Sequence, residues 1–130
     1  MTDEGYPRFD TFKIFIYHKS LEKAREFYRD ILGLEETHES DHVKQYWMPP
    51  NVAVGVVLDG HGYLPATEDK PVMLCFHVPD DGDIYELFDY LKGKGVKMLD
   101  EDVREFSAGG WVFLCEDPEG YVVEFVKRTP

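Results

Sequence analysis

The first half of the chain alternates short apolar runs with turn-forming residues, a pattern typical of strands grouped around one helix. Thr11 to Tyr17 is rich in aromatic and β-branched residues and predicts a strand. Ser20 is a suitable N-cap for a helix that Gly33 would end. The apolar face of this helix would consist of Leu21, Ala24, Tyr28, Ile31 and Leu32. Three more strands are expected at Leu34 to His38, Val43 to Met48 and Val52 to Leu58.

The second half repeats this order of elements. It follows a stretch without periodicity, Asp59 to Pro71, that is rich in Gly and Pro and predicts a linker. The acidic run from Asp80 to Asp83 favours the start of a helix whose apolar face would be Ile84, Leu87, Phe88 and Leu91. Asp117 to Gly120 fits a type I turn. Strands are expected at Val72 to Val78, Val96 to Leu99, Trp111 to Cys115 and Tyr121 to Val126.

The two halves can be superposed as an internal repeat. Ile14 to His18 corresponds to Leu74 to Val78 at an offset of 60 residues, and Val54 to Val56 corresponds to Val123 to Phe125 at 69. We therefore predict an α+β fold of two paired βαβββ modules, with curved mixed sheets around a cavity. Module 1 would span about 11–58, the linker 59–71 and module 2 about 72–127, within a single domain of residues 1–130.

Charge narrows the range of partners. Fourteen Lys and Arg against 26 Asp and Glu give a formal net charge of −12, which repels nucleic acid and anionic membranes and favours a cationic or neutral ligand. The alternative interpretation is that the acidity only keeps the protein soluble. The start of the chain, Met1 to Gly5, is acidic and polar, unlike a signal peptide, and Cys75 and Cys115 do not make a disulfide framework. We expect a cytoplasmic protein.

Three segments carry a family resemblance. Ser20 to Tyr28 with Ile31 to Leu34, then Leu91 to Lys97, and finally Phe113 to Phe125 resemble the two helices and the closing hairpin of the vicinal oxygen chelate superfamily. That superfamily includes glyoxalase I, extradiol dioxygenases, fosfomycin-resistance enzymes and bleomycin-resistance proteins. The resemblance covers roughly residues 10 to 127. It implies a glyoxalase-like fold and a symmetric homodimer whose sites combine residues of both chains.

The resemblance also implies a divalent metal held by four inward side chains. The corresponding positions here are Lys13, about Gly55, Met73 and Glu124, of which only Glu124 is a ligand of the family type. One carboxylate is too few for a catalytic divalent ion, so we expect no metal, with a misplaced metal site as the alternative. Lys13 would then reach solvent, pair with Glu124, or read a polar group of a ligand together with Glu124.

Strand alternation extends this set to a predicted ligand-binding wall. If Lys13 points inward, Phe15 and Tyr17 follow, and the same rule adds further residues of the second module. The resulting pocket would have aromatic, sulfur and apolar walls, unless these side chains simply fill the space. The predicted ligand-binding residues are Lys13, Phe15, Tyr17, Met73, Cys75, His77 and Glu124, together with Trp111, whose ring could stack on a planar ligand if it is not a core or interface residue.

Catalytic chemistry has weaker support. Glu124, His77 and Tyr17 are the only acid–base candidates near the predicted cavity. His38 and His42 lie across a turn and are expected to be solvated rather than to bind a metal. Two functions remain open. The first is a metal-free protein that binds, and sequesters, a cationic or aromatic small molecule. The second is a glyoxalase-like lyase or isomerase, or a dioxygenase, that acts in the same cavity.

Overall fold

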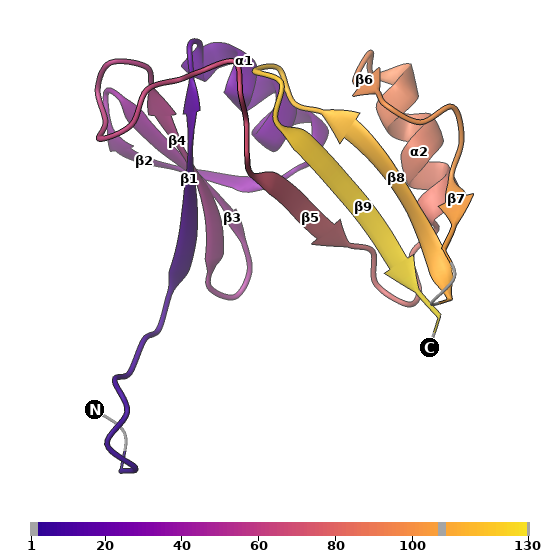
Figure 1. The fold of residues 1–130 in the computed structure, drawn as a ribbon, viewed down its shortest axis with the longest axis horizontal. Coiled ribbons are helices and arrows are strands. Elements are labelled where there is room, and N and C mark those ends of the chain that lie inside the picture. Colours follow the sequence, from indigo (N-terminus) through magenta and orange to yellow (C-terminus); the bar gives the residue numbers. More distant parts are fainter. Residues whose placement is uncertain (1–2, 107–108, 130) are drawn as a thin grey trace. The chain divides into compact units, whose positions relative to one another are not determined.

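The computed structural model describes residues 3–106 and 109–129 and divides the chain into two compact units, 1–66 and 67–130 (Figure 1). Each unit holds one open mixed sheet and one helical segment, which confirms the predicted α+β class. The first unit contains β1 (Phe12–His18), α1 (Leu21–Arg25), η1 (Glu26–Ile31), β2 (Glu35–Ser40), β3 (Val43–Met48) and β4 (Val52–Leu58). The second contains β5 (Met73–His77), α2 (Ile84–Gly93), β6 (Lys97–Met98), β7 (Arg104–Glu105), β8 (Gly110–Glu116) and β9 (Val122–Arg128).

The sheet of the first unit has the order β1-β4-β3-β2, with β1 parallel to β4 and the other pairs antiparallel. Its core lies between one sheet face and the helical segment. Tyr28 of η1 stacks on Tyr46 of β3 with ring centroids 5.6 Å apart, and both side chains are fully buried. Ile16 and Val56 are buried with them. Since side chains alternate along a strand, the opposite face is left to Lys13, Phe15 and Tyr17.

The first helix departs from the predicted geometry. Ser20 caps it as expected, since its Oγ accepts a hydrogen bond from the Lys23 N–H at 3.2 Å. After Arg25, however, the chain continues as a π-helix through Ile31. The wider turn brings two consecutive residues, Phe27 and Tyr28, into the core, where their rings meet edge to face at 4.8 Å. The predicted apolar face included Tyr28 but omitted Phe27, so the burial of Phe27 differs from the prediction.

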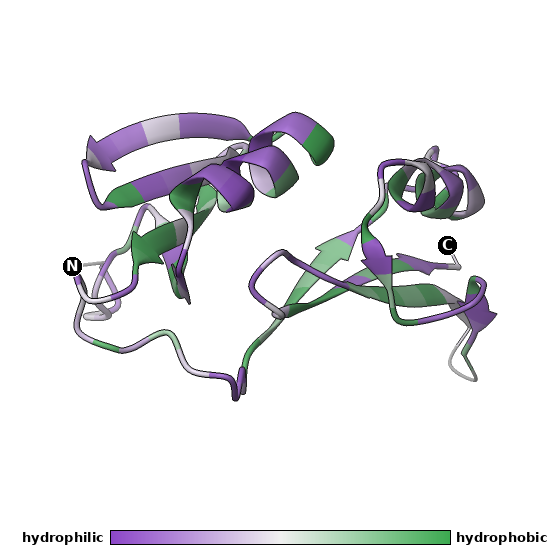
Figure 2. Ribbon diagram, turned by 90° about the horizontal axis from the view of Figure 1, so that it is seen from above, coloured by the Kyte–Doolittle hydropathy of each residue, from purple (hydrophilic) through white to green (hydrophobic). Residues whose placement is uncertain are grey.

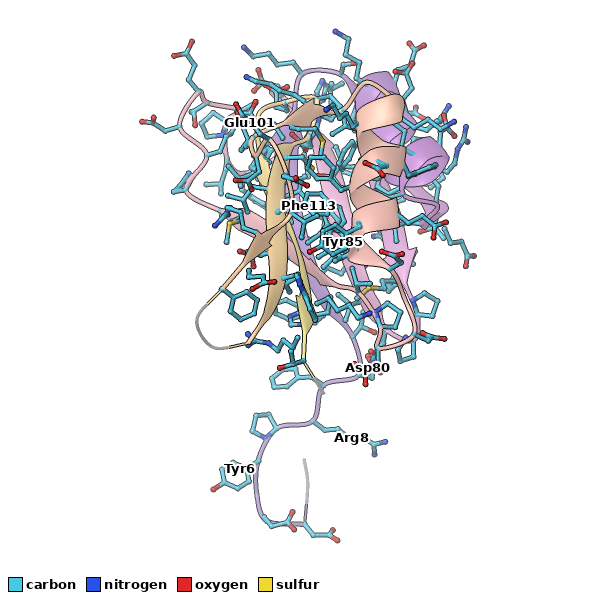
Figure 3. All side chains as sticks on the ribbon, turned by 90° about the vertical axis from the view of Figure 1, so that its right-hand side faces the viewer. Tyr6, Arg8, Asp80, Tyr85, Glu101 and Phe113 are labelled. Carbon is cyan, nitrogen blue, oxygen red and sulfur yellow. The ribbon has the colours of Figure 1, made fainter. Side chains whose placement is uncertain are left out.

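The sheet of the second unit has the order β5-β9-β8-β6, with β7 paired to β8. Phe113 of β8, which is labelled in Figure 3, packs edge to face on Phe88 of α2 at 5.1 Å and stacks on Phe125 at 5.2 Å. Asp83 caps α2 by accepting hydrogen bonds from the Tyr85 and Glu86 N–H groups. Two details differ from expectation: the strand predicted at Val96 to Leu99 covers only β6, and β7 was not predicted.

The structure also shows the predicted turn between β8 and β9 and the segment that separates the two units. Gly120 N–H donates to the Asp117 carbonyl at 3.0 Å, which confirms the predicted turn. Residues 59–71 form neither helix nor strand, and the boundary between the units falls within them.

Tyr6 and Arg8 lie on an N-terminal segment that extends away from β1 (Figure 3). In Figure 2, hydrophobic positions gather along the central strands, and the helices carry both hydrophobic and polar positions. Within the described residues, no helix is long and apolar enough to cross a membrane.

Candidate functional site

The free face of the first sheet brings together the aromatic residues predicted from β1. Strand pairing sets Lys13 beside Ala53, Phe15 beside Gly55 and Tyr17 beside Val57. Phe15 is 44% exposed although it sits in a sheet. The structure therefore places Lys13, Phe15 and Tyr17 on one face, and their role in binding remains a prediction.

Gly55 lets the ring of Phe15 lie flat against the sheet. A Cβ atom at position 55 would stand 2.5 Å from two ring carbons of Phe15, far inside van der Waals contact. Glycine inside a strand commonly marks such a close approach. Phe15 thus covers the position that the family resemblance assigns to a metal ligand.

A chain of polar contacts crosses the same face. Lys13 Nζ lies 5.4 Å from the centroid of the Trp47 ring, a cation–π contact. Trp47 Nε1–H donates to Thr37 Oγ1 at 2.8 Å, and the Thr37 hydroxyl donates to Gln45 Oε1 at 3.4 Å. Gln45, only 6% exposed, donates from its amide nitrogen to Glu39 Oε2. Each side chain in this series of contacts interacts with the next one, so the polar side chains on this face hold one another in place.

A pocket of about 340 Å³ opens on this face within the first unit. Its walls are aromatic and aliphatic, and its polar groups are a carboxylate, a serine hydroxyl, two phenol hydroxyls and an imidazole. The volume falls in the range of roughly 300–1,000 Å³ that is typical of small-molecule sites. The lining residues are Phe15, Tyr17, Glu39, Ser40, Val43, Val57, His61, Gly62 and Tyr63.

A β-bulge places the carboxylate at this pocket. The pairing of β2 with β3 shifts between His38 and Ser40, so that Glu39 is the extra residue and Ser40 pairs with Val43. A bulge re-aims side chains locally, and Glu39, Ser40 and Val43 all line the pocket. Sequence reasoning missed Glu39 and Ser40 because a bulge leaves no periodic pattern to read.

The segment that follows β4 supplies the remaining wall. A Cβ atom on Gly62 would stand 2.7 Å from both Tyr17 Cε1 and Val57 Cγ1, so a larger residue here would force these side chains to move. His61 stacks on His42 of the β2–β3 turn, with ring centroids 3.7 Å apart. The sequence assigned residues 59–71 to a linker, and it offered no pattern that would have linked His61 or Tyr63 to a site.

Four of the predicted residues of the second unit, Met73, Cys75, His77 and Glu124, also share a face. The pairing of β5 with β9 sets Met73 beside Val122, Cys75 beside Glu124 and His77 beside Val126. Cys75 Sγ donates to Glu124 Oε1 at 3.1 Å. Burial, together with this hydrogen bond and the negative charge of Glu124, raises the pKa of the Cys75 thiol to about 11. The thiol is therefore protonated near neutral pH and a poor nucleophile.

Trp111 does not join this group. Along β8 it shares the side of Phe113 and Cys115, both fully buried toward α2, whereas Glu124 pairs with Leu114 on the other side. Trp111 therefore lies on the opposite face of the second sheet from Glu124, and its role in ligand binding remains a prediction. The sequence suggested a role for Trp111 from its ring alone, without a register to fix its direction.

The residues present do not fit a divalent metal. Lys13 is a cation held over Trp47, the space beside Gly55 is filled by Phe15, and Met73 offers only a thioether. Glu124 is the single carboxylate of the four, and it accepts a hydrogen bond from Cys75. Among residues 3–106 and 109–129, no group of three or more His, Cys, Asp or Glu side chains is arranged to hold a metal ion.

Comparisons with known proteins agree with this architecture. The family model of the Glyoxalase/Bleomycin resistance protein/Dioxygenase superfamily matches residues 9–125. Lactoylglutathione lyase from Agrobacterium tumefaciens is similar in fold, with a TM-score of 0.73 and 18% identity over 94% of this chain and 96% of that one. TioX from Micromonospora sp. ML1 also has a TM-score of 0.73, with 14% identity over 92% of this chain and 99% of that one. No curated protein matches the sequence.

Proposed function

Because the chain belongs to the Glyoxalase/Bleomycin resistance protein/Dioxygenase superfamily, we propose that it is a metal-free member that binds and sequesters a small molecule. The observation that carries this proposal is the aromatic pocket of the first unit, on the same sheet face where Lys13 and Gly55 stand at metal-ligand positions. A wall of Phe15 and Tyr17 suits a ligand with a ring or an alkyl surface.

Chelator-treated protein, titrated with Mn²⁺, Ni²⁺ and Zn²⁺ while its melting temperature is followed, tests the metal-free part. A metal that binds only the folded state, at about 100 times its dissociation constant, adds about 2.7 kcal/mol, or several degrees in a domain of this size. We expect no saturable rise. A rise of several degrees that is lost in Glu124→Ala would overturn the proposal in favour of a glyoxalase-like lyase or isomerase, or a dioxygenase. Glu124, His77 and Tyr17 would then be the first residues to test for acid–base catalysis.

A screen of small aromatic molecules by the same melting assay tests the binding part. Ser40 lines the pocket on β2, and Ser40→Trp places an indole there without touching the core. Glu35→Trp, at an exposed position of the same strand outside the pocket, is the matched control. Hits should stabilise the wild type and Glu35→Trp but not Ser40→Trp. Hits that stabilise all three proteins equally would show that the pocket is not the site.

We also propose that the protein works in a reducing compartment, as expected for the cytoplasm. Both cysteines are free thiols, and Cys115 is completely buried. Mass spectrometry of protein isolated with rapid alkylation should find both thiols unoxidised, whereas a mixed disulfide at Cys75 would argue for a different compartment.

A further inference from the structure

Glu39 is the one acidic group of the pocket, and its surroundings favour a positively charged ligand. The lining holds no lysine or arginine. Tyr17 and Phe15 supply aromatic rings beside the same space, and the negative face of an aromatic ring attracts cations. A carboxylate among aromatic rings is the arrangement that recognises an alkylated or protonated amine.

The Glu39 carboxylate is held in position by a hydrogen bond. The bulge in β2 directs Glu39 toward Gln45, and the buried Gln45 amide donates to Glu39 Oε2. Gln45 is itself held, because its Oε1 accepts from Thr37, which in turn accepts from Trp47. Glu39 Oε1 has no protein partner among the residues that the structure describes, so one oxygen is anchored and the other is available to a ligand.

We infer that the pocket of the first unit selects small organic cations that carry an aromatic ring, with Glu39 as the counter-ion. This inference rests on the proposed function and adds the class of ligand and the residue that determines it. Gln45 is a positioning residue, since it acts through Glu39 and does not line the pocket.

Two isosteric probes separate charge from shape. meta-Trimethylammoniophenol carries a fixed positive charge, and meta-tert-butylphenol has nearly the same shape without it. Isothermal titration of the full chain with each probe gives their dissociation constants. We expect the cation to bind about tenfold more tightly than the neutral probe, the size of one favourable cation contact.

Variants then assign the preference to Glu39. Glu39→Gln keeps the side chain's shape and its bond to Gln45 but removes the charge, so binding of the cation should fall about tenfold while that of the neutral probe stays unchanged. Glu35→Gln removes one charge from the same strand outside the pocket and should preserve the preference.

Three other outcomes of these titrations would each overturn part or all of the inference. Equal binding of both probes, lost in Ser40→Trp, would overturn the cation preference while leaving a small-molecule pocket intact. A preference that Glu39→Gln and Glu35→Gln reduce equally would overturn the role of Glu39 and reflect only net charge. Failure of both probes to bind at millimolar concentration would overturn the inference, and the broader aromatic screen would then decide the proposed function separately.

Discussion

At the scale of single residues, Cys75 shows how a neighbour sets reactivity. Burial, the hydrogen bond to Glu124 and its charge raise the pKa of the thiol to about 11. At pH 8, roughly one thiol in a thousand would then be ionised, and the thiolate is the nucleophile. Cys115, fully buried beside Asp117 and Glu116, has its pKa raised to about 12 and should react even more slowly.

Glu124→Gln should therefore make Cys75 more reactive. Removal of the negative charge lowers the thiol pKa, so the rate of alkylation by iodoacetamide at pH 8 should rise several-fold and the midpoint of the pH–rate profile should move down. Cys75→Ser measures the background from Cys115, and Glu105→Gln, on exposed β7, controls for net charge. An unchanged profile in Glu124→Gln would show that the contact does not persist in solution.

At the scale of elements, a polar cluster ties the helical segment of the first unit to β2 and β3. Glu36 Oε2 accepts from Arg25 Nε at 3.0 Å and from the buried Tyr46 hydroxyl at 2.9 Å, and Arg29 Nη1 lies 3.6 Å from Glu36 Oε1. Burial alone would raise the pKa of Glu36, but the hydrogen bonds from Tyr46 and Arg25 and the two arginine charges outweigh it and lower that pKa.

The sign of this shift gives a pH dependence. A carboxyl group with a lowered folded-state pKa contributes stability that is fully present above its unfolded pKa, here 4.5, and lost as the pH falls through its folded value. Between about pH 5.5 and pH 3, the urea midpoint of the wild type should fall more steeply than that of Glu36→Gln. Glu35→Gln, at the exposed neighbouring position, should follow the wild type. Parallel curves for the wild type and Glu36→Gln would contradict the cluster's role.

Strands and helices with a regular hydrophobic pattern could be predicted from the sequence, but the π-helical turn and the β-bulge that interrupt such patterns could not. β3 and β4 match the predicted bounds residue for residue, because β-branched and aromatic runs flank an unmistakable Pro-Pro-Asn turn. The π-helical turn at Glu26–Ile31 and the bulge at Glu39 arise from tertiary packing, which no local pattern encodes. The candidate site depends on that bulge. Strand alternation therefore predicted Phe15 and Tyr17, whereas no pattern predicted Glu39.

At the scale of the whole molecule, an apolar surface at one end of the first sheet requires an explanation. The strand-end patch consists of Phe9, Phe12, Met48 and Val52, which are all exposed, Phe12 by 63% and Phe9 by 83%. Pairing of Phe12 and Met48 with Val52 places three of them side by side, and a hollow of about 450 Å³ adjoins Phe9 and Phe12. Exposed apolar patches of this kind mark protein interfaces.

We expect this patch to take part in a symmetric homodimer, the commonest soluble oligomer. Light scattering after size exclusion should give about 30 kDa, twice the 15.1 kDa of one chain. Because each chain carries a net charge of −12, the dimer fraction at micromolar concentration should increase from 20 to 200 mM salt as repulsion is screened. Phe12→Asp should shift the equilibrium toward the monomer, whereas Tyr85→Asp, at an exposed position of α2, should not. A mass of one chain at every concentration and salt level would rule the dimer out, and a dimer unaffected by Phe12→Asp would place the interface on another surface.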